Sequence, residues 1–102
     1  MERLKELRKR LENLLGRHAF KMVLFGSRAR GDYSDDSDVD VAILVQGLNR
    51  EMKKRILEEV ADFELEHLFP ISALVLSEEE FAHLKARERR IALDIEREGV
   101  SL

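Results

Sequence analysis

Residues 26–45 read GSRARGDYSDDSDVDVAILV, a polar segment rich in Gly, Ser, Arg and Asp that runs into an apolar one. It begins where a short apolar run, residues 21–25, stops at Gly26, and it ends in a second apolar run over residues 39–45. Short apolar runs bounded by glycine and polar residues are typical of buried strands. We therefore expect two strands joined by a polar, glycine-rich segment.

Amphipathic helices are expected on both sides of these strands. Leucines at helical spacing over residues 4–15 predict a helix that ends at Gly16, and Asn49 is placed to cap a second helix that ends before Pro70. A third strand is expected over residues 71–76. The second helix is expected to bury one apolar face, made of Met52, Ile56, Val60, Phe63 and the residues from Leu65 to Leu68.

The last quarter of the chain predicts a helical region from residue 78 to residue 98. Ser77 and Glu80 have the spacing of a capping box. The charged residues 85–90 could divide this region into two helices, and residues 100–102 have no evident role in a core. The order of elements indicates an α/β or α+β fold and leaves the strand order open. The apolar stripe of the region is Phe81, Leu84, Ile91 and Ile95.

Length and composition limit the class of protein. With 102 residues, the chain is expected to form a single domain, residues 1–102. No apolar run is long enough for a membrane span and the N-terminus lacks the apolar stretch of a secretory signal, so we expect a cytoplasmic protein. The absence of cysteine excludes thiolate chemistry, and the net charge of −3 gives no overall basic surface for nucleic acid.

Gly26, Ser27, Arg28 and Arg30 are candidates for binding phosphate. Because they follow a strand, Ser27 could cap a short helix whose free backbone N–H groups attract an anion. Gly26 would let the backbone approach that anion, and the Ser27 hydroxyl and an arginine could add hydrogen bonds. An ordinary polar loop has a similar composition, so this segment alone does not establish the site.

Asp38 and Asp40 stand at the head of the second strand, and ten residues separate Ser27 from Asp38. Alternate side chains of a strand point to one face, so both carboxylates point together, with Cα atoms roughly 6.6 Å apart. Both can then reach one hard divalent cation such as Mg²⁺. The alternative is an acidic turn that includes Asp35 and Asp36. A turn explains Asp40 poorly, because apolar residues flank it.

Taken together, the Gly-Ser pair and the Asp38-Val39-Asp40 motif resemble the signature of the DNA polymerase β-like nucleotidyltransferase superfamily. The longer string of residues 26–45 is similar to its minimal nucleotidyltransferase branch, whose members are lone catalytic domains, and the resemblance covers nearly the whole chain. It implies the polymerase β palm-like fold, a small mixed sheet flanked by helices.

The resemblance also implies a chemistry and a partner. It implies a nucleoside triphosphate, with ATP the expected substrate, bound at Gly26 and Ser27, with charge neutralised by the arginines at 28 and 30. It implies one or two Mg²⁺ ions on Asp38 and Asp40, and nucleotidyl transfer to a hydroxyl of a protein. Members of this branch often accompany a small helical HEPN-domain protein as the antitoxin of a toxin–antitoxin pair, so a homo- or hetero-oligomer is expected.

One position departs from the family pattern. Active members usually carry a third carboxylate on the next core strand, where this chain has Ser72. A hydroxyl is a weaker metal ligand and cannot act as a base at neutral pH. Two functions stay open: a transferase that works with two carboxylates, and a domain of the same fold that binds and neutralises its partner without chemistry. Polymerases and antibiotic-modifying transferases rank lower, because they generally need a second domain.

Overall fold

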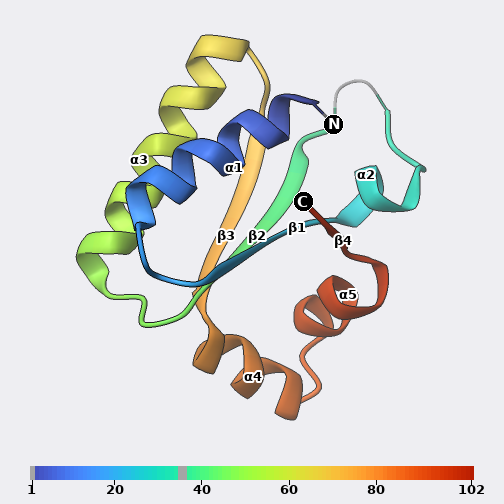
Figure 1. Ribbon diagram of the computed structural model, residues 1–102. Helices are drawn as coiled ribbons and strands as arrows, with labels where there is room; N and C mark the ends of the chain where they lie inside the picture. Colours follow the sequence, from blue (N-terminus) through green and yellow to red (C-terminus); the bar gives the residue numbers. More distant parts are fainter. Residues whose placement is uncertain (1, 35–36) are drawn as a thin grey trace.

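A computed structural model describes residues 2–34 and 37–102 as a four-stranded sheet with helices on both faces (Figure 1). The strand order is β3-β2-β1-β4, in which β2 is parallel to β3 and β1 is antiparallel to both β2 and β4. The predicted mixed α/β class is confirmed. The helices are α1 (Glu2–Leu15), α2 (Gly26–Arg30), α3 (Arg50–His67), α4 (Glu78–Ala86) and α5 (Arg90–Glu98), and the strands are β1 (Phe20–Phe25), β2 (Val39–Val45), β3 (Ile71–Ser77) and β4 (Val100–Ser101).

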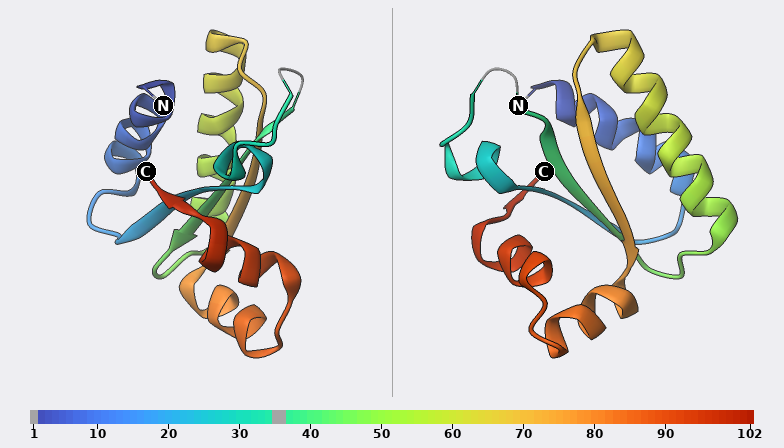
Figure 2. Two further views of the ribbon diagram at one scale, coloured as in Figure 1. Left: turned by 90° about the vertical axis from the view of Figure 1, so that its right-hand side faces the viewer. Right: turned by 180° about the vertical axis from the view of Figure 1, so that it is seen from behind.

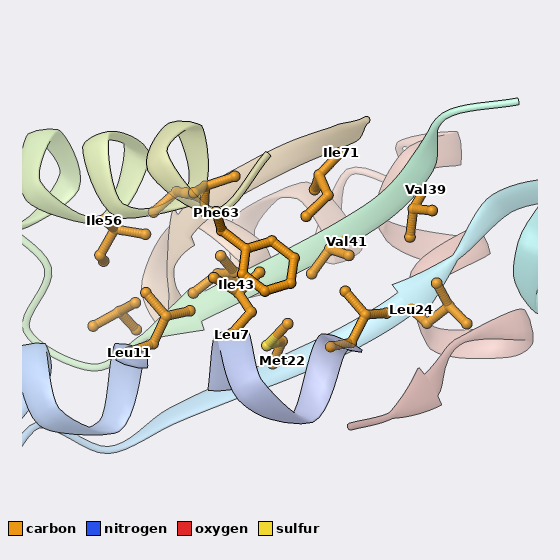
Figure 3. Packing of buried hydrophobic residues seen from close by; sticks show 14 of the residues in the cluster. Leu7, Leu11, Met22, Leu24, Val39, Val41, Ile43, Ile56, Phe63 and Ile71 are labelled. Carbon is orange, nitrogen blue, oxygen red and sulfur yellow. The ribbon is translucent and has the colours of Figure 1, made fainter. Parts of the chain in front are cut away.

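Helices α1 and α3 cover one face of the sheet and enclose the main core (Figure 3). The odd-numbered residues 39–45 of β2 point into this core and are at most 1% exposed. Phe63 of α3 meets them there together with Leu7 and Leu11 of α1. Burial of each side chain of this size contributes roughly 1.5–3 kcal/mol, so this face supplies most of the apolar stabilisation.

The other face of the sheet is covered only in part. Helices α4 and α5 pack over it through a smaller cluster that includes Ala42, Leu44, Leu76 and Ile95. These helices lie toward the carboxyl ends of β2 and β3 (Figure 1). At the opposite ends of the two strands, Ser72 is exposed and Asp40 is half-buried next to Gly26, the first residue of α2.

The predicted helix ends are confirmed. Asn49 caps α3 by accepting the Met52 N–H at 2.8 Å. Ser77 and Glu80 form a reciprocal capping box at the start of α4, with both hydrogen bonds 3.0 Å long. The charged stretch does contain a break, because α4 ends at Ala86 and α5 begins at Arg90.

Three expectations about apolar residues are wrong. Residues 100–102 do contribute to the core, because Leu102 packs against the main cluster and β4 pairs with β1. Leu65 and Leu68 are 76% and 87% exposed, since the buried stripe of α3 lies on the opposite side of the helix. Ile91 is 42% exposed, because the next residue turns toward the core in its place.

Two other features concern the limits of the described chain. The acidic pair Asp35 and Asp36 lies outside the described residues. None of the helices in residues 2–34 and 37–102 combines the length and the apolar character that crossing a membrane requires.

Candidate active site

The strand register brings the two sequence motifs together at one end of the sheet. Asp40 on β2 lies opposite Phe25 at the end of β1 and beside Ser72 near the start of β3. Gly26 follows Phe25 directly, so the polar turn begins next to the acidic strand. Asp40 also falls on the face of the sheet that α4 and α5 cover only in part, because its neighbours in β2 point into the α1–α3 core.

Gly26 and the Asp40 carboxylate are in close contact. A β carbon built on Gly26 would lie 2.3 Å from Asp40 Oδ2, and the φ angle of Gly26 is +72°. Only glycine satisfies both conditions, because a side chain would meet the carboxylate and the left-handed backbone would be strained. The position of the Asp40 carboxylate therefore depends on glycine at position 26.

Asp38 and Asp40 form a pair of carboxylates whose charges interact. Asp38 is exposed and lies just before β2, and Asp40, the second residue of β2, is half-buried. Burial raises the pKa of Asp40, the charge of Asp38 raises it further, and Arg30 opposes both effects. Negative charge at this end of the sheet is thus incompletely compensated, which favours binding of a cation.

Ser27 does not cap α2 as predicted. The helix begins two residues earlier than predicted, at Gly26, so the capping position falls on Phe25, which has no side-chain acceptor. Ser27 lies inside the first turn, where its carbonyl accepts the N–H groups of Gly31 at 2.9 Å and Asp32 at 3.2 Å. The Ser27 hydroxyl is not used to close the helix and stands beside Gly26.

Arg28 is directed at the segment that leads into the acidic strand. Its Nη2 donates to the Ser37 carbonyl at 3.0 Å, and its guanidinium carbon lies 4.2 Å from the centroid of the Tyr33 ring. Both contacts hold residues on the approach to Asp38. The stacking of Tyr33 on Arg28 could not be predicted, because a contact of this kind has no sequence signal.

Arg30 is exposed and belongs to a different set of contacts. It pairs with Asp32 at 3.2 Å and with Glu98 of α5 at 2.9 Å. The hydrogen bond that Arg30 donates to Glu98 is the main cause that raises the pKa of Arg30, followed by the one that it donates to Asp32. The charge of Arg30 also acts on Asp40, where it lowers the pKa of that carboxyl against the effects of burial and of Asp38.

The third position of the site holds an exposed hydroxyl. Ser72 lies beside Asp40 in the parallel register. Across residues 2–34 and 37–102, no three acidic or histidine side chains gather into a group that could hold a metal ion. Glu64 is occupied elsewhere, since its carboxylate accepts the Ile71 N–H at 3.2 Å and fixes the start of β3.

The donor set fits one hard cation better than two. Mg²⁺ prefers oxygen ligands and is held in nucleotide sites by one or two carboxylates together with substrate phosphates and water. Asp38 and Asp40 supply those carboxylates, one just before β2 and one near its start, and Gly26 lies next to Asp40. A second cation would depend on Ser72, which is a poor ligand.

Comparisons with known proteins agree with this geometry. A family model described as a nucleotidyltransferase domain matches residues 4–97. A protein of Methanocaldococcus jannaschii, provisionally named a protein adenylyltransferase, is 36% identical over 76 residues, which cover 74% of this chain and 77% of that protein. The crystal structure of a protein from Sulfolobus solfataricus, provisionally named a nucleotidyltransferase, shares the fold, with a TM-score of 0.61 and 24% identity over 98% of this chain and 76% of the other. With the paired motifs at one sheet end and a family match along nearly its whole length, the chain belongs to the nucleotidyltransferase domain family.

Proposed function

We propose that the chain transfers AMP from ATP to a hydroxyl of a partner protein. The observation that supports the proposal is the proximity of Gly26 and Asp40, because the turn proposed to bind phosphate begins next to the carboxylate proposed to bind the cation. The provisional name of the Methanocaldococcus relative supports a protein acceptor. Residues 1–102 would act as a single catalytic domain.

Each polar group of the site has a role in this proposal. Asp38 and Asp40 would hold Mg²⁺, which when bound neutralises charge on the triphosphate. Gly26 and Ser27 would bind the phosphates through backbone N–H and hydroxyl groups, and Arg30 would neutralise charge beside them. Arg28 would contribute to the phosphate site by fixing the approach to Asp38.

The proposed reaction is a substitution at the α-phosphorus. The acceptor oxygen forms a bond to the α-phosphorus, the bond from that phosphorus to the β-phosphate oxygen breaks, and pyrophosphate leaves. The acceptor hydroxyl must lose its proton. With Ser72 in the third position, Asp40 is left to accept that proton at a carboxylate oxygen while it also holds the cation, so we expect slow turnover.

The proposed acceptor is a small helical HEPN-domain protein, with the transferase acting as the antitoxin of the pair. This part of the proposal rests on the resemblance of residues 26–45 to minimal nucleotidyltransferases. The second candidate function is neutralisation of the partner by binding alone, and the observation that favours it is the exposed hydroxyl of Ser72 where a carboxylate is usual.

Label transfer separates the two functions. The purified chain is incubated with Mg²⁺, α-labelled ATP and a co-purifying partner or lysate, beside the double variant Asp38→Asn/Asp40→Asn. The matched control is Glu78→Gln/Glu79→Gln, which removes the same charge from exposed positions at the far end of β3. We expect the wild type and the control to label a macromolecule. The double variant is expected to lose this labelling by at least about 100-fold. An absence of labelling with each of the four nucleotides, with partner binding intact, would leave the binding function.

A further inference from the structure

One flank of the molecule carries an apolar stripe that the rest of the fold does not cover. Leu57, Ala61 and Leu65 of α3 are all exposed, and Leu57 and Leu65 are 42% and 76% exposed. Residues spaced by four lie along one side of a helix, so the three form a continuous stripe. A shallow apolar depression includes Leu57 and Ala61.

The stripe lies beside the outer edge of β3. Glu64 of α3 binds the Ile71 N–H at the start of β3. At the other end, the charge of Lys53 reaches Glu80, where it adds to the hydrogen bonds of Ser77 that mainly lower the pKa of that carboxyl. Leu57 falls between Lys53 and Glu64 on the same side of α3. The helix therefore runs antiparallel to β3 (Figure 2), and the stripe lies on the side of α3 that carries these two contacts.

The edge of β3 is unprotected. Within the described residues, β3 pairs only with β2, so its outer backbone groups have no strand beside them. The seven residues of β3, ISALVLS, include no charge and no proline. Proteins usually protect an exposed edge with charged residues, proline, a bulge or a covering element, because a bare edge pairs readily with another strand.

Charges along α3 are segregated in a way that fits antiparallel packing with itself. Arg50, Lys53 and Lys54 flank the stripe near the start of the helix, where Glu51 is the one acidic residue, and Glu58 and Asp62 flank it further along. When two copies of α3 pack antiparallel, the basic half of one meets the acidic half of the other. Parallel packing would oppose like charges, which is unfavourable.

We propose that a second copy of this chain covers this flank, which we call the α3–β3 flank, through β3–β3 strand pairing and antiparallel α3–α3 packing. A single two-fold axis satisfies both contacts. Because α3 and β3 run along the same line in opposite directions, an axis perpendicular to that line places each element antiparallel to its copy in the second subunit. Closed two-fold dimers are the most common soluble oligomers and use the same patch on both subunits. The resulting assembly has one continuous sheet of eight strands.

The first test is the mass of the purified chain in solution. Sedimentation equilibrium over about 1–500 µM is expected to show a species of about 24 kDa, twice the 11.9 kDa of the chain. Leu57→Gln is expected to weaken the dimer at least tenfold. The matched control is Ile91→Gln on α5, because Ile91 is also 42% exposed, and this variant is expected to leave the dimer unchanged. Thermal melts establish that both variants fold.

A charge exchange tests the antiparallel arrangement. Lys53→Glu/Lys54→Glu reverses two of the basic charges beside the stripe, and Glu58→Lys/Asp62→Lys reverses the two acidic charges that face them in the antiparallel arrangement. Each variant alone is expected to be monomeric, and an equimolar mixture is expected to recover the dimer. A wild-type chain that stays monomeric over the whole concentration range overturns the proposal. This holds even if a different protein is found to bind the α3–β3 flank. So does a dimer that both Leu57→Gln and the charge exchange leave intact.

Discussion

The two faces of the sheet differ although the same strand forms both. On the face toward α1 and α3, Val41 and Ile43 of β2 are fully buried beneath two helices. On the other face, Ala42 and Leu44 are buried beneath α4 and α5, but Asp40 is left half-buried beside an exposed Ser72. The covered face supplies stability, and the open end of the second face keeps charged groups within reach of a ligand.

This difference shows how a chain of this size can hold a costly pair of carboxylates. Like charges at a strand end are unfavourable unless they remain partly hydrated or are neutralised. The main core compensates for that cost elsewhere in the fold. The expectation is that changes on the covered face lower stability strongly, whereas changes at the open end affect binding and chemistry more than folding.

The largest effect is expected for Phe63→Ala on the covered face. Phe63 is 0% exposed, and removal of a buried phenyl ring leaves a cavity that costs about 3–5 kcal/mol of unfolding free energy. Urea unfolding followed by circular dichroism measures the loss. Phe81→Ala is the control of the same residue type on the other face, where the ring is only partly buried. An equal loss in the two variants would contradict the difference between the faces.

A smaller effect is expected for Gly26→Ala at the open end. Gly26 and Gly31 both have positive φ angles, +72° and +86°, so alanine at either position should cost about 1–2 kcal/mol in backbone strain. Only Gly26 faces the Asp40 carboxylate, whereas a β carbon on Gly31 meets nothing within 4 Å. We expect Gly26→Ala to lose more stability than Gly31→Ala and to abolish label transfer. Urea titrations and the labelling assay, run on both variants, measure this; equal behaviour would mean that the contact has no role.

Much of this contrast could be predicted from the sequence. Apolar residues on both sides of Asp40 predicted a buried strand with an out-of-place acid, and the helix caps at Asn49 and Ser77 were predicted from side chains that bond to their own neighbours. These features are local, because each depends on residues within one turn or one strand. The family resemblance then related the two motifs to one site.

Features that depend on distant contacts could not be predicted. The two residues of β4 have no strand pattern of their own, and their pairing depends on the edge that β1 leaves free. Arg28 and Arg30 have the same chemistry and differ only in what α2 turns them toward. Leu65 is apolar and yet exposed. Its exposure could not be predicted, because hydrophobicity alone does not distinguish a core position from a surface that another molecule can cover.

The smallest effect on stability is expected for Asp40→Asn, and its sign is the reverse of the others. Burial and the charge of Asp38 raise the pKa of Asp40 above its ordinary value of 3.8 in the folded chain. The folded state therefore holds this proton more tightly than the unfolded state, so stability falls as pH rises from 3.8 through the raised pKa and stays reduced above it. Asparagine does not ionise, so the variant avoids this loss of stability.

Thermal melts across this pH range give the measurement. Asp40→Asn is expected to raise the Tm slightly at pH 7, and the gain should disappear below pH 3.8, where the wild-type carboxyl is protonated in both states. Addition of Mg²⁺ with ATP should raise the Tm of the wild type and not that of the variant, because a ligand stabilises only the state that binds it. A variant that is less stable than the wild type at pH 7 without ligand would mean that Asp40 supports the fold. The open end of the sheet would then resemble the covered face, and the carboxylate would need no ligand to account for its position.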